Sequence, residues 1–270
     1  MQPAVQVDPG TVAFLRAGGC VYAEEEARIL TEAARSSDTL RAFLERRVRG
    51  EPLEYIAGWA EFCGLRVPLR AGVFVPRRRS EFLAACAIRS ARAAATRSSG
   101  SRPVRVLDMC CGSGAIGLAV AIGSGDIELL AADDSLVAVG CARDNLARVS
   151  GRVYQGDLFA ALPPTELHCL DVIVANAPYV PTDEIQWLPA EARLYEPLST
   201  LDGGPDGTGV QSRILESAAE WLRAPGVVLI ETGEEMADST ARIAREAGFA
   251  PEIRADAELG ATVMLATLLA

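Results

Sequence analysis

An alternation of short apolar strands with helices begins near residue 104 and constrains the fold of this sequence more than any other feature. Residues 104–107 form an apolar run, residues 109–114 are predicted to be a tight turn, and residues 115–122 a helix. A second apolar strand is predicted at residues 127–132, and the alternation continues to residue 248. Such an alternation predicts an α/β fold with a doubly wound sheet.

The remaining elements of this part of the chain fit the same architecture. Further strands are predicted at residues 153–159, 172–174, 227–231, 251–255 and 262–267, and further helices at residues 135–149, 209–223 and 235–247. Residues 182–211 are predicted to be a long irregular segment, and long segments of this kind in compact domains are usually functional or mobile.

The N-terminal part has a helical pattern instead. Residues 24–35 and 38–49 place apolar side chains at helical spacing. Alternation near residues 62–67 and 72–75 predicts a hairpin. We therefore expect a small N-terminal helical domain that binds substrate (residues 1–55), a hairpin linker (56–75) and a larger α/β domain (76–270).

The strand at residues 172–174 ends in an unusual way. Asn176 interrupts the apolar run, and Pro178 cannot continue a central strand because it has no N–H for the ladder. A polar amide, two backbone carbonyls and an aromatic ring are thereby presented at the carboxyl end of a strand, where open α/β sheets bind ligands. An ordinary exit from a strand is the alternative, since Asn-x-Pro is common in turns.

The tetrapeptide Asn176-Ala177-Pro178-Tyr179 resembles the Asn-Pro-Pro-Tyr signature of methyltransferases that act on a planar nitrogen, either the glutamine side-chain amide or the exocyclic amine of adenine. An amide nitrogen is a poor nucleophile, so the enzyme has to grip and orient it. The Asn176 side chain and the Ala177 carbonyl can hold the acceptor N–H groups, and Tyr179 can stack on the flat group. We take these four residues as the candidate catalytic residues.

The turn after residue 107 is similar to the Asp-x-x-x-Gly-x-Gly loop of Rossmann-like methyltransferases, which bind S-adenosyl-L-methionine. This resemblance implies that the cofactor is bound by Asp108, Cys110, Cys111, Gly112, Ser113, Gly114, Asp133, Asp157, Leu158 and Asn176. Asp133 ends the next strand, where a ribose-binding acid is expected, and its neighbour Asp134 is the alternative. Either acid can instead cap the following helix, and Asp157 can simply belong to a turn.

The segment from Arg46 to Arg77 resembles the linker of the protein-(glutamine-N5) methyltransferases, which methylate release factors. That family shows Gly-x-Pro-x-x-Tyr-Ile-x-Gly, then Phe-x-Gly-Leu, then Pro-Arg-Pro-Glu-Thr-Glu. Here the last motif reads Pro76-Arg77-Arg78-Arg79-Ser80-Glu81, and Ser80 is expected to cap a helix over residues 81–97. The resemblance spans residues 20–267 and implies a seven-stranded class I methyltransferase sheet.

The implied activity is N5-methylation of a glutamine in a protein, most simply a peptide chain release factor with a Gly-Gly-Gln loop. The alternatives are an adenine-N6 methyltransferase acting on DNA or RNA, and a cofactor-binding protein without catalysis, which Ala177 in place of proline favours. The net charge of −10 argues against stable nucleic-acid binding, which depends on neutralising phosphates. Arg78 and Arg79 could instead select another acidic protein partner.

Composition places this protein in a reducing interior. No apolar run is long enough to span a membrane, and the start, Met1 to Ala4, lacks the features of a signal peptide, so we expect a cytoplasmic protein. The seven cysteines are irregularly spaced, which is typical of free thiols. His168 is the only histidine, so we expect no metal site and a free surface imidazole at this position.

Overall fold

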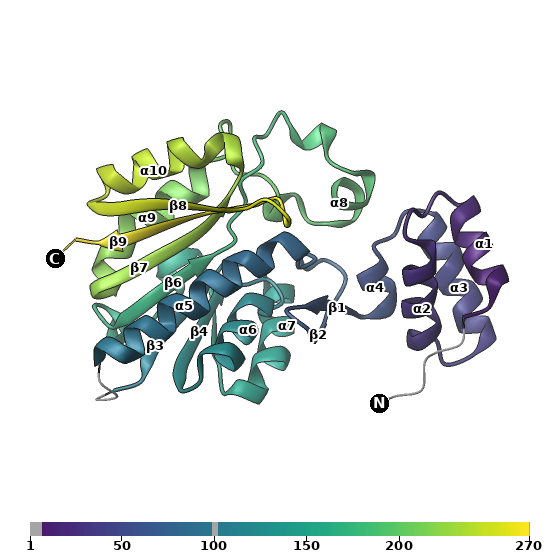
Figure 1. Ribbon diagram of the computed structural model, residues 1–270, viewed down its shortest axis with the longest axis horizontal. Helices are drawn as coiled ribbons and strands as arrows, with labels where there is room; N and C mark the ends of the chain where they lie inside the picture. Colours follow the sequence, from purple (N-terminus) through teal and green to yellow (C-terminus); the bar gives the residue numbers. More distant parts are fainter. Residues whose placement is uncertain (1–6, 99–101, 270) are drawn as a thin grey trace.

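The computed structural model describes residues 7–98 and 102–269, so the expectation about a signal peptide at the chain start lies outside the described residues. A small helical unit stands beside a larger α/β unit (Figure 1). The helical unit consists of α1 (Pro9–Ala17), α2 (Ala23–Ala33), α3 (Ser37–Val48) and α4 (Leu53–Ala57). Its core is formed by Leu15, Ala23, Ala27, Leu30, Leu44 and Ile56.

The two helices predicted in this unit, α2 and α3, are confirmed, whereas α1 and α4 were not predicted. The signal for α1 was present, because Asp8 accepts a hydrogen bond from the Thr11 N–H and Pro9 opens the first turn. Helix α4 crosses the expected boundary at residue 55 and ends at Gly58, which has a φ of 82°. The helical unit therefore extends to Ala57.

A hairpin of β1 (Trp59–Phe62) and β2 (Leu65–Pro68) follows α4. The prediction of a second strand near residues 72–75 is wrong, because β2 ends at Pro68 and the chain then turns. Val73 and Val75 are buried instead in a small cluster with Ala138. Phe62 and Val67 pack into the core of the α/β unit.

Seven strands form one sheet, in the order β5-β4-β3-β6-β7-β9-β8. Strands β3 to β7 pair in parallel, and β9 runs antiparallel to both of its neighbours. The bounds are β3 (Val104–Met109), β4 (Ile127–Asp133), β5 (Arg152–Gln155), β6 (Leu170–Ala175), β7 (Leu222–Thr232), β8 (Phe249–Asp256) and β9 (Ala261–Leu268). The predicted α/β class and seven-stranded sheet are confirmed.

Helices cover both faces of this sheet (Figure 1). The core on one face of the sheet contains side chains from α5 (Glu81–Ser98), α6 (Ala115–Ser124) and α7 (Leu136–Leu146). The core on the other face contains side chains from α9 (Gly209–Trp221) and α10 (Ala237–Glu246). The strands read as continuous apolar runs because both faces are buried. Within the described ranges, no helix combines the length and apolarity needed to cross a membrane.

The order of the strands determines where a ligand can bind. The chain runs from β3 outward through β4 and β5, and then returns to β6 on the other side of β3. Such a reversal opens a crevice at the carboxyl ends of the two central strands. Met109 pairs with Ala175, so the turn after β3 and the loop that carries Asn176 leave the sheet side by side.

The segment after β6 is more regular than predicted. It contains α8 (Ala190–Tyr195) and short 3-10 turns at Ile185–Trp187 and Leu198–Thr200. The prediction of a long irregular segment over residues 182–211 therefore holds only between these short elements, and α9 already begins at Gly209. His168 is exposed, which confirms the predicted surface position of this residue.

Candidate active site

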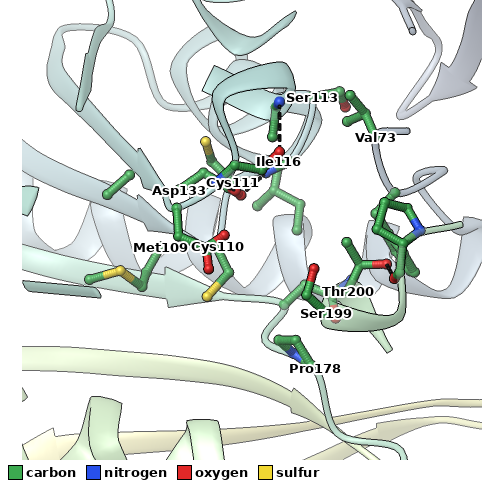
Figure 2. Close-up of a pocket in the computed structure, with 18 of the residues that line it drawn as sticks. Val73, Met109, Cys110, Cys111, Ser113, Ile116, Asp133, Pro178, Ser199 and Thr200 are labelled. Carbon is green, nitrogen blue, oxygen red and sulfur yellow. Dashed lines mark hydrogen bonds between the residues drawn. The ribbon is translucent and has the colours of Figure 1, made fainter. Parts of the chain in front are cut away.

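A cavity lies at the carboxyl edge of the sheet, between the turn after β3 and the segment around residue 200. Figure 2 shows Cys110, Cys111 and Asp133 on one side of this cavity, with Ser199 and Thr200 across it. Of the residues expected to be functional, those that line it are Cys110, Cys111, Gly112, Ser113, Asp133, Asp157, Leu158, Asn176 and Pro178. We refer to it as the first cavity.

The turn after β3 lines the cavity and is held in an unusual backbone conformation. Cys110, Gly112 and Gly114 all have positive φ, at 56°, 55° and 76°. The Cys111 N–H donates to the Ala132 carbonyl of β4, which ties the turn to the neighbouring strand. Burial raises the pKa of both the Cys110 and the Cys111 thiol, so these cysteines stay protonated and serve as lining.

Asp108 and Gly114 are not among the residues that line the cavity, and their expected contact with the cofactor stays a prediction. The Asp108 carboxylate is fully buried and accepts the Gly117 N–H of α6 at 2.8 Å, and burial raises its pKa to about 8. A side chain at Gly114 would meet the Leu146 side chain at 3.0 Å. These two residues therefore support the turn from the side of α6 and Leu146.

Asp133 faces the cavity and also supports the turn. Its Oδ2 accepts the Gly112 N–H at 2.9 Å, and its Oδ1 accepts the Ser135 N–H at 3.0 Å. Burial raises the pKa of this carboxyl, although the two backbone donors oppose the shift. Helix α7 is capped by Ser135, which removes capping as the role of Asp133 or Asp134. Asp134 also lines the cavity.

The loop after β5 brings a charged pair to the edge of the cavity. Leu158 has a φ of 48°, which turns the chain sharply after Asp157. Arg213 of α9 lines the cavity and donates to Asp157 Oδ2 at 2.5 Å. No local pattern pointed to Arg213, because this residue approaches from a helix and lies 56 positions along the chain from Asp157.

A second cavity adjoins the first. It is bordered by α8, by the arginines before α5 and by all four candidate catalytic residues, Asn176, Ala177, Pro178 and Tyr179. Asn176, Pro178, Phe74 and Thr200 line both cavities. Asn176 therefore lies at the junction of the two cavities, where a molecule bound in one cavity would meet a molecule bound in the other.

The side chains of Asn176 and Tyr179 are held from behind the loop. The Asn176 Nδ2 donates to the Ser80 Oγ at 3.2 Å, and the Tyr179 hydroxyl donates to Glu231 Oε1 at 3.3 Å. Ser80 was expected to cap α5, but it ends a 3-10 turn, Arg78–Ser80, that leads directly into this helix. Glu231 was not predicted to be functional, although its position at the end of an apolar strand was the available signal.

Comparisons with known proteins show which family this chain belongs to. The model of the family "Methyltransferase small domain" matches residues 95–193. The release factor glutamine methyltransferase of Thermodesulfovibrio yellowstonii is 34% identical over 228 residues, which cover 83% of this chain and 78% of that protein. That of Geobacter sulfurreducens is 35% identical over 211 residues, covering 77% and 70%. This chain belongs to the release factor glutamine methyltransferase family.

A solved structure supports the fold of this methyltransferase. The 16S rRNA N2 G1207 methyltransferase of T. thermophilus, in complex with AdoMet and guanosine, superposes with a TM-score of 0.52 at 21% identity. The match covers 78% of this chain and 50% of that one. At this identity the similarity supports the fold alone, which is that of the class I methyltransferases.

The arginines before α5, where the sequence departs from its family, make defined contacts in this methyltransferase. Arg77 donates to both carboxylate oxygens of Glu196, at 2.6 and 2.7 Å, and Glu196 is buried. Arg79 lies 3.3 Å from Glu231, and its guanidinium lies 5.7 Å from the centre of the Tyr179 ring. These arginines therefore compensate buried carboxylates beside the second cavity.

A glycine-rich segment after α8 packs against the candidate catalytic loop. The Val180 N–H donates to the Leu201 carbonyl at 3.0 Å, and the Gly203 N–H donates to the Val180 carbonyl at 2.9 Å. A side chain at Gly203 would lie 2.7 Å from the Tyr179 Cα and 2.5 Å from the Gly207 oxygen. No real Cβ fits at these distances, so the close approach requires glycine.

We expect Gly203→Ala to lower turnover by roughly 10-fold, because the methyl group would push the Tyr179 backbone out of position. Cofactor affinity, measured by calorimetry, should stay close to that of the unchanged protein, since the first cavity does not include this residue. Gly233→Ala is the matched control, because a Cβ there would meet its nearest atom only at 3.8 Å. Equal turnover in both variants would contradict the proposed packing role.

Proposed function

We propose that this protein methylates the side-chain amide nitrogen, N5, of a glutamine in a peptide chain release factor, with S-adenosyl-L-methionine as the methyl donor. The observation that carries the proposal is the position of Asn176 at the junction of two cavities. The cofactor occupies the first cavity, and the acceptor glutamine enters through the second.

The residues of the first cavity fit the cofactor. Asp133 offers carboxylate oxygens for the ribose hydroxyls, and each oxygen has more than one lone pair, so its backbone contacts leave capacity. Ile116 and Leu158 supply apolar surface for the adenine ring. Cys110 to Ser113 line the cavity, and the glycine at position 112 allows a ligand to approach the turn closely. When bound, the cofactor supplies an electrophilic methyl group on a sulfonium sulfur.

The candidate catalytic loop orients the acceptor. Asn176 Oδ1 and the Ala177 carbonyl accept the two N–H groups of the glutamine amide, which fixes the plane of the amide and aims its nitrogen at the first cavity. The Tyr179 ring packs against the flat amide group. Burial raises the pKa of Tyr179, so its hydroxyl keeps its proton and continues to donate to Glu231. Catalysis of this kind comes mainly from positioning.

Ala177 in place of proline leaves this scheme intact, because only the carbonyl of residue 177 is given a role. This favours catalysis over a binding protein without activity. The acceptor on the release factor is proposed to be its Gly-Gly-Gln loop, since two glycines would let a narrow segment enter the second cavity. We propose no stable binding of nucleic acid, because the net charge of −10 opposes it.

The helical unit is proposed to hold the rest of the release factor. Arg47 of α3 donates to Glu26 at 2.7 Å and to Glu191 of α8 at 2.9 Å, so the helical unit is tied to a wall of the second cavity. We propose the division into residues 1–55, 56–75 and 76–270, in which the last two residues of α4 fall after the first boundary. We also propose a cytoplasmic location, where the seven free cysteines would stay reduced.

The test of this function is a parallel methylation assay. The protein and labelled S-adenosyl-L-methionine are incubated with a release factor, with a peptide that carries a Gly-Gly-Gln loop, and with DNA and RNA. We expect label in the release factor and a mass increase of one methyl group on the glutamine. Label only in nucleic acid, resistant to protease, would overturn the proposal.

A further inference from the structure

A buried carboxylate stands behind the candidate catalytic loop. Glu231, at the end of β7, is 2% exposed, and its Oε1 receives both the Tyr179 hydroxyl and the Arg79 Nε, each at 3.3 Å. Its Oε2 is buried and has no hydrogen-bond partner among the described residues. A buried carboxylate oxygen without a donor is costly, so a neighbouring hydroxyl will direct its proton there.

Ser80 is that hydroxyl. Its side chain is 1% exposed. Burial raises the pKa of the Glu231 carboxyl, and the Ser80 hydroxyl is among the neighbouring groups that oppose this shift. Arg79 is permanently charged and also favours the carboxylate form. An ionised carboxylate can only accept hydrogen bonds, so Ser80 has to donate toward Glu231.

The direction of this donation determines how Asn176 is turned. A serine hydroxyl has one proton, and once that proton points to Glu231 the Ser80 oxygen can only accept. The partner on Asn176 is therefore its Nδ2, at 3.2 Å from the Ser80 Oγ. The Asn176 Oδ1 then faces away from Ser80. With the opposite orientation, Asn176 would present N–H groups to the N–H groups of an acceptor amide, and the buried Oε2 of Glu231 would be left without a donor.

We infer that Ser80 and Glu231 are positioning residues that fix the orientation of the Asn176 amide, so that its oxygen accepts an N–H of the group being methylated. The hydrogen bonds run in one direction, from Asn176 to Ser80 and on toward Glu231. This inference rests on the proposed function, because it gives the Asn176 oxygen its task. It also gives a role to Glu231, a buried carboxylate near the end of β7 that lines neither the first nor the second cavity.

The test compares Ser80→Ala, Ser80→Thr and Glu231→Gln, with Ser124→Ala as the control. Ser124 carries a buried hydroxyl oxygen without a described partner, at the end of α6 and away from the site. We expect Ser80→Ala to lower kcat by roughly 10-fold, the value of one lost hydrogen bond. Ser80 also lines the first cavity, so calorimetry of the cofactor is used to separate any loss of binding from the loss of turnover. Ser80→Thr, which keeps the hydroxyl, should recover kcat to within about 3-fold.

Glu231→Gln can donate as well as accept, so it removes the direction of the chain of hydrogen bonds. It should also lower kcat, and adding it to Ser80→Ala should cause little further loss, because both changes act through Asn176. The side-chain amide signals of Asn176 in NMR spectra, identified by their absence in Asn176→Ala, should shift in Ser80→Ala and stay in place in Ser124→Ala. This readout does not depend on turnover.

Two results would overturn the inference. One is a normal kcat in Ser80→Ala, and the other is equal loss in Ser80→Ala and Ser80→Thr when both unfold at the temperature of the unchanged protein. Failure of the proposed function looks different. In that case the unchanged protein methylates an acceptor other than glutamine, and the ratios between variants and unchanged protein are then measured on that acceptor.

Discussion

Asn176→Ala is expected to lower turnover by at least about 100-fold, because it removes the side chain that orients the acceptor nitrogen. Asn176 lines both cavities, and its amide is already held by Ser80 at 3.2 Å. The orientation of this amide is therefore set before the acceptor arrives. The fold should survive, since the residue follows the last position of β6 and its side chain is only partly buried.

Steady-state methylation of a release factor measures this effect, and thermal unfolding checks the fold. Gln186→Ala is the matched control, because Gln186 carries the same type of amide on an exposed 3-10 turn outside both cavities. Cofactor affinity should fall far less than turnover. Turnover near that of the control would remove Asn176 from the site.

Asp133→Ala is expected to weaken S-adenosyl-L-methionine binding by roughly 1.5–3 kcal/mol, the range for hydrogen bonds to a charged group. The carboxylate faces the first cavity and also accepts the Gly112 N–H at 2.9 Å. Its loss should therefore remove a proposed ribose contact and also release the turn after β3. Both consequences weaken binding in the same direction.

Calorimetric titration of the cofactor measures this loss, with Asp134→Ala as the neighbouring control. Asp134 lines the same cavity but is exposed, and none of the described hydrogen bonds involves its carboxylate. We expect its replacement to change affinity by less than about 0.5 kcal/mol, which is usual for a surface substitution. If the two variants exchange these results, Asp134 is the ribose ligand.

The sequence by itself determined the elements and the family of this protein. Helix α5 and strand β6 lie where the apolar pattern predicted them, because periodicity and turn formers act within a few residues of the chain. The segment from Asn176 to Tyr179 was also recognisable, since its chemistry is contiguous. The sequence pattern did not predict helix α4, and it wrongly predicted a strand at residues 72–75. Both are short segments in which tertiary packing outweighs local preference.

The tertiary structure alone decided which residues support the site. Ser80 reaches Asn176 across 96 positions of the chain, and Glu231 reaches Tyr179 across 52. Asp108 occupies the first position of the expected Asp-x-x-x-Gly-x-Gly motif, yet its carboxyl group points to α6 and away from the cavity. Contacts of this kind depend on how the sheet orders its strands and on which helix closes over each strand end. No pattern within a single segment encodes them, because both partners acquire their positions only when the sheet is assembled.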